Sequence, residues 1–331
     1  MAPLRLRQSI SKEKISTYLG SQRTIAYNEA SSRGPSHNLR SIAWNPLGTL
    51  IATGGERTLR VWNPERQNVK YSTELKGHAA PIEKVAFNPV KDAELCSVSS
   101  DGVVKFWDVR TKAVINEVKG LGDAFTLAWS PDGESLIVGN KSDNLFVLSP
   151  TESTPISSHQ QPIQTNQITF CHSGSKIFLT TGEGKIKIFS YPEFEPMFYS
   201  KSDPTIPFTL NGHTSSCISV DMQPTARFLA SGGSDSIIAL WDTTDWICQR
   251  TLIDMTGPVR SISFSFDGSF IVGGSEEGSG LEIAHTETGE YVHSIKTINP
   301  NASVAWHPSR YWLAYTDGGS LKILGVDPDR K

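Results

Sequence analysis

The sequence predicts an all-β fold, a seven-bladed β-propeller, in which seven four-stranded sheets close into a ring. A short pattern, an apolar pair followed by a turn, recurs seven times at steps of 43, 42, 41, 52, 42 and 42 residues. A period near 42 residues is typical of a propeller blade, and apolar and polar residues alternate within each copy as in a half-buried strand. The 27 glycines and 19 prolines supply the turns. The copies begin at Ser41, Lys84, Thr126, Gln167, Ser219, Ser261 and Ser303.

The fullest copy runs from Gly212 to Asp242 and contains three strand-like runs separated by turns. It opens with Gly-His and closes with Trp-Asp, a pattern that resembles the WD40 repeat. A buried tryptophan N–H can donate to a serine hydroxyl, the hydroxyl to one histidine nitrogen, and the other histidine nitrogen to an aspartate. We expect such a structural tetrad to tie the strands together in two blades. The expected tetrads are His78, Ser97, Asp101 and Trp107, and His213, Ser231, Asp235 and Trp241.

The two tetrads also contain Ser-His-Asp sets, the composition of a triad for acyl transfer. Both sets lie at structural positions of the repeat, each with a tryptophan at the same offset, Trp107 or Trp241. A serine buried under that ring cannot reach a substrate, so no enzymatic activity is expected. The chain has no phosphate-binding glycine motif, and its cysteines lack metal-ligand spacing, so we expect neither a cofactor nor a metal.

The two ends of the chain are expected to complete the last blade together. After Leu321 to Leu324 only seven residues remain, too few and too polar for an outer strand. The segment Arg23 to Ala30 can take that place and remove an open sheet edge. The prediction is therefore a propeller over residues 23–331. Residues 1–22 are expected to form a basic, flexible arm, since residues 1–40 carry a net charge of +5 and the remaining 291 residues carry −8.

The long step of 52 residues places extra sequence at Tyr191 to Thr209, which is rich in proline and aromatic residues. This stretch should hold the outer strand of the fourth blade and an enlarged loop. Two interpretations stay open: a packed surface loop, or a loop that contacts a partner, because aromatic residues are enriched at interfaces.

Function is expected on the surfaces of the ring. The narrower face presents residues at the start of each inner strand and in the turns between second and third strands. Phe125 and Ile218 are apolar there, with Arg40 and Arg260 beside them, a combination typical of a protein contact patch. Alternatively, some of these side chains fill the central channel. The candidate contact face comprises Arg40, Arg57, Glu83, Phe125, Lys141, Ile218 and Arg260.

Three stretches extend the resemblance beyond the generic repeat. Residues 127–148 (LAWSPDGESLIVGNKSDNLFVL), 185–197 (KIKIFSYPEFEPM) and 303–315 (SVAWHPSRYWLAY) together resemble the WD40 subunits of the THO complex, the THO subunit 3 family. That complex is the core of TREX, the transcription–export assembly. The resemblance departs at residues 273–280, where the turn is longer than the family's, and the first 22 residues carry no family feature.

The resemblance implies a non-catalytic scaffold in the nucleus that assembles with large helical THO subunits and helps to couple transcription to mRNA processing and nuclear export. A DEAD-box RNA helicase and an RNA-binding export adaptor would be indirect partners. The acidic body has no stripe of basic and aromatic residues, so direct RNA binding is expected to be weak or absent. No run of about 18 apolar residues exists, and no membrane span is expected.

Two other classes of function stay open on the sequence. One is a WD40 scaffold of a chromatin-modifying or ubiquitin-ligase complex that binds a peptide on the propeller face. The other is a propeller hydrolase, which needs clustered carboxylates at the channel mouth. The predicted ring offers only Glu83 and the nearby Asp123 for that purpose.

Overall fold

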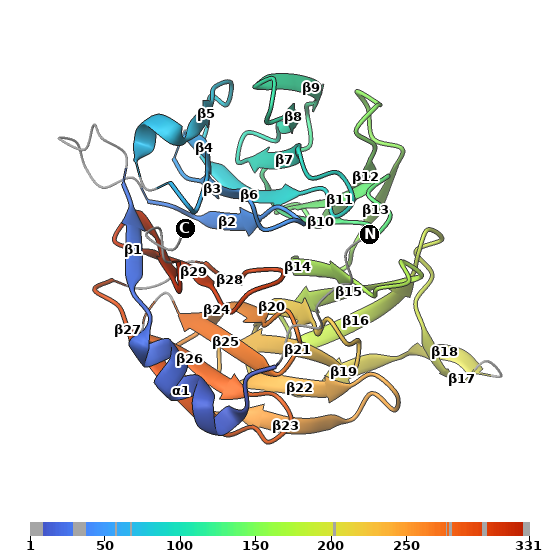
Figure 1. Cartoon of the computed structure of the whole chain (residues 1–331). Coiled ribbons are helices and arrows are strands. Elements are labelled where there is room, and N and C mark those ends of the chain that lie inside the picture. Colours follow the sequence, from blue (N-terminus) through green and yellow to red (C-terminus); the bar gives the residue numbers. More distant parts are fainter. Residues whose placement is uncertain are drawn as a thin grey trace, which may run out of the picture.

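The computed structural model describes residues 9–28, 38–56, 58–66, 68–200, 203–275, 277, 280–299 and 303–326. Within these ranges, seven four-stranded antiparallel sheets form the blades of a ring (Figure 1). A two-stranded hairpin, β17 (Phe198–Ser200) and β18 (Asp203–Pro207), extends from the fourth blade. The predicted seven-bladed propeller is confirmed.

Each blade runs from an inner strand at the channel to an outer strand at the rim, and the blades are numbered in chain order. Blade 1 contains β2 (Ser41–Trp44), β3 (Ile51–Gly54), β4 (Leu59–Trp62) and β5 (Thr73–Leu75), with a 3-10 turn η1 (Val69–Tyr71) before β5. Blade 2 contains β6 (Ile82–Phe87), β7 (Glu94–Ser99), β8 (Val104–Asp108) and β9 (Ala113–Val118). Blade 3 contains β10 (Ala124–Trp129), β11 (Leu136–Asn140), β12 (Asn144–Leu148) and β13 (Ser157–Gln160). Blade 4 contains β14 (Thr165–Phe170), β15 (Lys176–Thr181), β16 (Lys185–Ser190) and β19 (Thr209–Asn211).

The remaining blades follow the same order, except that the last takes its outer strand from the start of the chain. Blade 5 contains β20 (Cys217–Met222), β21 (Phe228–Gly233), β22 (Ile238–Asp242) and β23 (Cys248–Leu252). Blade 6 contains β24 (Val259–Phe264), β25 (Phe270–Ser275), β26 (Gly280–His285) and β27 (Tyr291–Lys296). Blade 7 contains β28 (Val304–Trp306), β29 (Leu313–Asp317), β30 (Ser320–Leu324) and β1 (Thr24–Tyr27).

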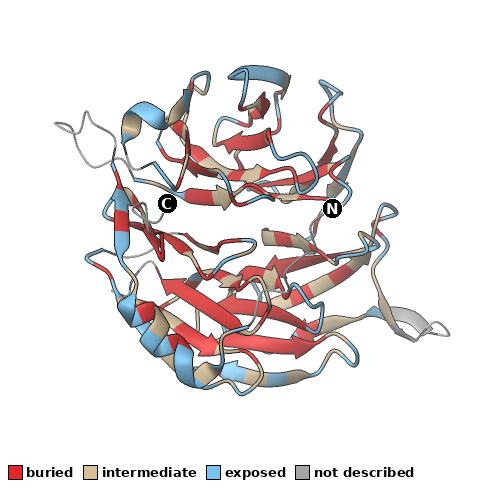
Figure 2. Cartoon of the chain, in the orientation of Figure 1, coloured by how far each residue is buried: buried red, intermediate tan, exposed pale blue. Residues whose placement is uncertain are grey.

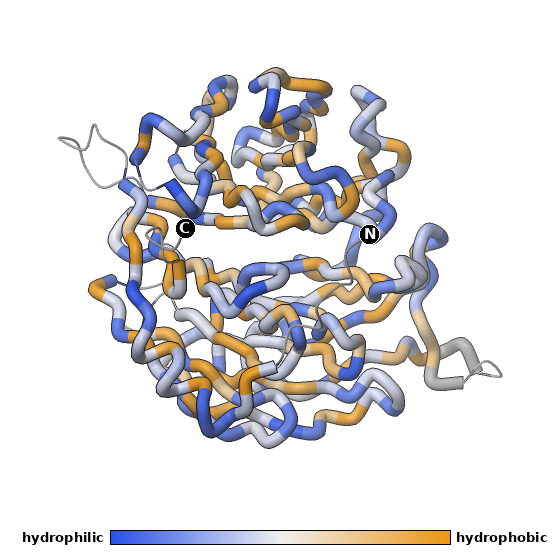
Figure 3. Tube along the Cα trace, viewed as in Figure 1, coloured by the Kyte–Doolittle hydropathy of each residue, from blue (hydrophilic) through white to orange (hydrophobic). Residues whose placement is uncertain are grey.

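The hydrophobic core is divided among the contacts between successive blades. In the described part of the chain, seven clusters of buried apolar residues each join one blade to the next. Figure 2 shows that buried residues concentrate in the strands, and Figure 3 shows hydrophobic positions interleaved with hydrophilic ones along them. Each blade is therefore stabilised mainly by its neighbours, as expected for a repeat architecture.

Polar contacts reinforce the same seams. Gly133, in the first turn of blade 3, has φ +72°, and a Cβ there would lie 2.3 Å from the Asn88 amide oxygen of blade 2. Its carbonyl accepts a hydrogen bond of 2.8 Å from Asn88 Nδ2. The turn therefore needs glycine both for its backbone conformation and for this close approach. Equivalent bonds join Gln223 Nε2 to the Gly268 carbonyl (2.7 Å) and His307 Nε2 to the Gly48 carbonyl (2.9 Å).

The ring closes through β1, which pairs antiparallel with β30 from Thr24 opposite Leu324 to Tyr27 opposite Leu321 (Figure 1). Ile25 and Tyr27 are buried in the cluster that joins blade 7 to blade 1. The Tyr27 hydroxyl donates to the backbone carbonyl of Pro64, which follows the third strand of blade 1. The N-terminal strand therefore contacts both blade 7 and blade 1, and it forms the outer strand of blade 7 as predicted.

The described part of the N-terminal segment differs from the predicted flexible arm of residues 1–22. Helix α1 (Lys12–Ser21) packs against β27, and its Ile15 and Leu19 are buried between blades 6 and 7. The backbone N–H of Ile10 donates to the Tyr311 hydroxyl (3.1 Å), and Tyr311 donates to Asp267 (2.5 Å). The i, i+4 pair of apolar residues gives this short, otherwise polar helix one buried face.

The inserted stretch at residues 191–209 forms the β17–β18 hairpin and leads into the short outer strand β19. This strand pairs only with the first half of β16, from Lys185 to Lys187. The second half of β16 is covered by residues 194–197, through a bridge between Phe189 and Pro196 and a bond from Met197 N to Ile188 O (2.9 Å). The outer edge of blade 4 is thus assembled from two separate segments.

The blade-5 tetrad has every bond that its residue types allow. Trp241 Nε1 lies 2.9 Å from Ser231 Oγ, which lies 2.8 Å from His213 Nε2. His213 Nδ1 lies 3.1 Å from the Asp235 carboxylate, which also accepts from Thr214 N (2.9 Å). The side chains of His213 and Asp235 are 0% and 6% exposed, so this is a buried and fully paired network.

The blade-2 tetrad is incomplete, which corrects the expectation that it matches blade 5. Trp107 Nε1 and His78 Nε2 both contact Ser97 Oγ, at 2.8 and 2.7 Å. Asp101, however, is exposed and accepts from the backbone N–H of Val103 (3.3 Å). The buried His78 Nδ1 has no hydrogen-bond partner among the described residues. Burial, and then a neighbouring lysine, lowers the pKa of His78 to about 4, so the ring stays neutral.

Deleting residues 1–30 should lower the melting temperature sharply, because β1 and α1 leave together. Four buried apolar side chains are lost, each stabilising the fold by about 1.5–3 kcal/mol. A deletion of residues 1–22, which removes α1 but keeps β1, should cost less. Thermal unfolding of the three proteins is the measurement, and an unchanged melting temperature for the longer deletion would contradict this closure.

The two tetrads predict unequal effects of removing their aspartates. Asp235→Ala should lower the free energy of unfolding by roughly 1–3 kcal/mol, since it leaves a buried histidine nitrogen unpaired. Asp101→Ala should change it by less than about 0.5 kcal/mol, as for other exposed side chains. Chemical denaturation of both variants tests the difference, and equal losses would show that Asp101 pairs with His78 after all.

Candidate protein-interaction face

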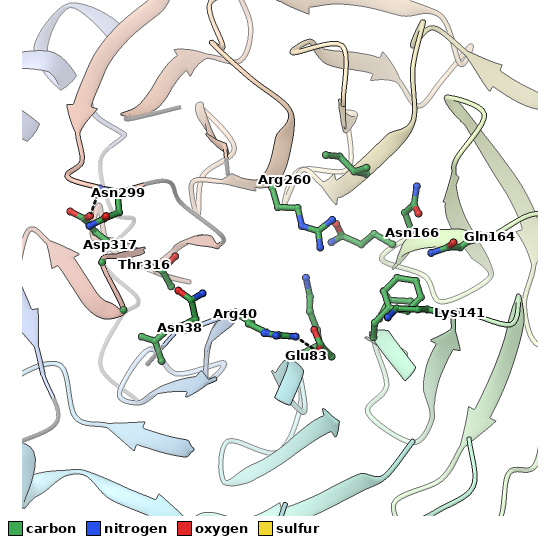
Figure 4. A pocket seen from close by; sticks show the side chains of 18 residues that line it. Asn38, Arg40, Glu83, Lys141, Gln164, Asn166, Arg260, Asn299, Thr316 and Asp317 are labelled. Carbon is green, nitrogen blue, oxygen red and sulfur yellow. Dashed lines mark hydrogen bonds and ion pairs between the residues drawn. The ribbon is translucent and has the colours of Figure 1, made fainter. Parts of the chain in front are cut away.

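A cavity of about 760 Å³ opens at the centre of the ring and gathers the predicted contact residues (Figure 4). Arg57 lies outside the described residues. In Figure 4 the Arg260 side chain enters the cavity from the wall opposite the Arg40–Glu83 pair. The six predicted residues that line the cavity are Arg40, Glu83, Phe125, Lys141, Ile218 and Arg260.

A β-bulge near the start of five inner strands positions these side chains. At each bulge the register between inner and second strand skips one residue. The skipped residue is left out of the ladder, and a bulge re-aims its side chain. In these five blades, the same backbone device therefore presents one side chain at the channel mouth. The skipped residues are Glu83, Phe125, Asn166, Ile218 and Arg260.

Most charges at the mouth are paired. Arg40 forms an ion pair with Glu83, and Lys141 Nζ lies 2.8 Å from Asp123. Asp317 is buried at the wall, where it accepts from Lys322 Nζ (2.6 Å) and from two backbone N–H groups. Phe125 and Ile218 are half-buried among these polar groups. The result is a mixed face that offers cations, amides and two apolar contacts.

Lys84 is the exception among the cavity's cations. It is the third residue of the inner strand β6, at a position of the repeat where the other six copies carry serine, threonine or glutamine. No ion pair is found for Lys84 within the described ranges. Burial, and then the Arg260 guanidinium, lowers the pKa of the Lys84 ammonium to about 8. Lys84 and Arg260 therefore add two positive charges to the cavity lining, which also contains the paired Arg40 and Glu83.

Several residues that line this cavity were not predicted from the sequence, and Lys84, Asn299 and Asp317 are the charged and amide residues among them that matter most here. Lys84 could have been identified from the sequence, because it is the one charged residue at its position in the seven copies of the repeat. Asn299 and Asp317 come from the loop before blade 7 and the end of β29, outside the positions that the repeat pattern ranks.

Neither of the two Ser-His-Asp sets belongs to the residues that line this cavity. The Ser-His-Asp set of blade 5 is sealed inside the blade, and that of blade 2 lacks its His–Asp contact. Among the residues that the structure describes, no group of three or more His, Cys, Asp or Glu side chains could hold a metal ion. In that same part of the chain, no helix is long and apolar enough to cross a membrane.

Comparisons with known proteins agree with the fold. The WD domain, G-beta repeat family matches residues 29–63, 69–108, 205–242 and 246–279. The solved β-propeller domain of Cps50 (Swd1) from Myceliophteria thermophila superposes with a TM-score of 0.76 over 92% of this chain and all of that one. Its sequence identity of 17% supports the shared fold alone. The chain thus belongs to the WD40-repeat family of β-propellers.

Similar proteins place the chain in one family within the WD40 propellers. THO complex subunit 3 of Arabidopsis thaliana is 32% identical over 320 residues, which cover 92% of this chain and 98% of that protein. WD repeat-containing protein AAC3 of Dictyostelium discoideum is 33% identical over 298 residues, 83% of this chain and 60% of that one. Protein groucho of Drosophila melanogaster is 24% identical over 72% of this chain and 31% of its own length. Within the WD40 propellers, the chain belongs to the family of THO complex subunit 3.

Lys84 should make stability depend on pH in the alkaline range. An unfolded lysine titrates near 10.4, so below pH 8 the folded state carries the cost of a charged, half-buried Lys84. That cost disappears as the pH rises from about 8 to 10.5. Lys84→Met should therefore raise the free energy of unfolding at pH 7 by roughly 1–3 kcal/mol, and by less at pH 10.

Denaturation at the two pH values measures this effect. Lys141→Met is the matched control, because Lys141 is exposed and paired, and it should change little at either pH. A Lys84→Met protein less stable than the wild type at pH 7 would show that the Lys84 charge is compensated.

Proposed function

We propose that the protein is a non-catalytic scaffold subunit of a nuclear THO complex that helps to couple transcription to mRNA processing and export. The observation that carries the proposal is the similarity to THO complex subunit 3 over 92% of this chain and 98% of that relative. A similarity that extends over nearly all of both chains favours a shared role over a shared repeat alone.

The proposed working surface is the channel-mouth face, defined by Arg40, Glu83, Phe125, Ile218 and Arg260. Arginine and aromatic residues are enriched among the side chains that dominate binding energy at interfaces. The bulges are part of the strands, so these side chains are held before a partner arrives and little ordering entropy is lost on binding. This supports a scaffold that presents fixed contacts.

The proposed direct partners are the large helical subunits of the THO complex. A DEAD-box RNA helicase and an RNA-binding export adaptor would join through those subunits. Direct RNA binding by the propeller is expected to be weak or absent, since the chain beyond residue 40 carries a net charge of −8. An acidic body opposes a phosphate backbone unless basic and aromatic groups form a groove.

Affinity purification tests the proposal. The tagged protein, recovered from RNase-treated nuclear extract, should carry the large helical THO subunits in stoichiometric amounts. Recovery of chromatin-modifying or ubiquitin-ligase subunits in their place would overturn the assignment.

Variants test the proposed face separately. Phe125→Ala combined with Arg260→Glu should lower recovery of the THO subunits at least about tenfold, if the pair behaves as an interface hot spot. The control is Lys112→Glu, a similar charge change on the exposed turn after β8. Normal recovery with the double variant would exclude the channel mouth while leaving the THO assignment intact.

A further inference from the structure

A second cavity, of about 640 Å³, lies away from the channel, between the outer parts of blades 3 and 4. One side is formed by β13 and the residues after it, including His159 and Pro162. The other is formed by β16 and by the segments that flank the β17–β18 hairpin, which extends beyond the ring in Figure 1. We call this cavity the blade-3/4 groove.

The wall of the groove is aromatic and firmly held. The Phe194 ring stacks on His159 with centroids 3.8 Å apart and an angle of 8° between the planes. Phe194 also meets Tyr191 edge-on at 5.8 Å, and the Tyr191 hydroxyl lies 2.6 Å from Ser135 Oγ of blade 3. These contacts fix the ring across the seam, so the groove offers preorganised apolar surface.

In the described part of the chain, a lysine of the groove, Lys187, lacks an ion pair that the equivalent cations of blades 1 and 2 form. In blade 1, Arg60 of the third strand lies opposite Glu74 of the outer strand and pairs with it at 3.1 Å. In blade 2, Lys105 lies opposite Glu117 and forms the same kind of ion pair. Blades 1 and 2 thus each neutralise the third-strand cation with a carboxylate of their own outer strand.

Blade 4 has the cation without the carboxylate. Lys187 occupies the equivalent place, and its partner across the ladder is Thr209. The neighbouring Glu183 pairs with Lys185 instead (3.1 Å), and no ion pair is found for Lys187 within the described residues. Lys187 is half-buried. Burial, and then the Lys185 charge, lowers its pKa although Glu183 opposes the shift.

We propose that the blade-3/4 groove binds an acidic, hydrophobic segment of a partner protein. A carboxylate of that segment pairs with Lys187 and supplies the negative charge that Glu74 and Glu117 supply in blades 1 and 2. An adjoining apolar or aromatic side chain packs against the groove wall that contains Phe189 and Phe194. The inference does not depend on the THO assignment, because it concerns the chemistry of the partner segment and not the identity of the complex.

Fluorescence anisotropy with designed probes tests the charge requirement. The probes are short labelled peptides that alternate Glu with Leu and Phe, and analogues in which Gln or Lys replaces Glu. The Glu peptide should bind the full chain at least about tenfold more tightly than the Gln peptide, and the Lys peptide should bind most weakly. No saturable binding of the Glu peptide up to about 1 mM, or equal binding of Glu and Gln peptides, would overturn the proposal.

Variants locate the binding. Lys187→Glu should remove the preference for the Glu peptide and favour the Lys peptide, whereas Lys176→Glu, the same change in β15 outside the groove, should leave it. Thr209→Glu places a carboxylate opposite Lys187, as in blades 1 and 2. It should raise the melting temperature and weaken binding of the Glu peptide. An unchanged affinity in Thr209→Glu would contradict the role of Lys187, even if Lys187→Glu failed to fold.

Discussion

The structure depends on one pairing, that of the N-terminal strand β1 with β30 of the last blade. In a ring of repeats, each blade buries its apolar surface only against its two neighbours. An incomplete last blade therefore leaves apolar surface exposed and destabilises the ring. Without β1, blade 7 would expose a strand edge and the seam to blade 1 would lose Ile25 and Tyr27. Helix α1 extends the same contact onto blade 6. Fewer than 30 N-terminal residues therefore connect three blades.

Closure of the ring also bears on the proposed contact face, because the inner strands that carry it pack against the blades on either side. Glu83, Phe125 and Arg260 lie at bulges in inner strands, each paired with the second strand of the same blade. The packing of the neighbouring blades holds these strand pairs in place. A side chain at the mouth keeps its direction only while the ring stays closed. The channel-mouth face and the blade-3/4 groove also lie on different parts of the disk, so one partner need not exclude another.

The repeat period made much of this architecture readable from the sequence. A constant step fixes where each blade starts, and the residues at one position of the repeat must therefore share a place in space. This is why six of the candidate contact residues meet at one cavity. It is also why the serine, histidine and tryptophan of each tetrad meet as expected.

Features that depend on deviations from the repeat could not be read in this way. Asp101 has the expected type and offset, yet its carboxylate accepts from the backbone N–H of Val103, because local side chain-to-backbone hydrogen bonds compete with longer-range ones. Helix α1 has only Ile15 and Leu19 as buried anchors, too few to reveal an amphipathic pattern. The groove joins His159 to Phe194 across two blades, a contact with no local signal.

The most direct test of the scaffold account is amide hydrogen exchange on the free protein and on its complex with the large helical THO subunits. We expect β1 to exchange as slowly as β30 in both states, because the two form one ladder. The complex should slow exchange at the bulged segments 82–84, 124–126 and 259–261, whose amides lie at the channel mouth. Fast exchange of β1, or unchanged exchange at all three bulges in the complex, would contradict a closed ring that binds partners through this face.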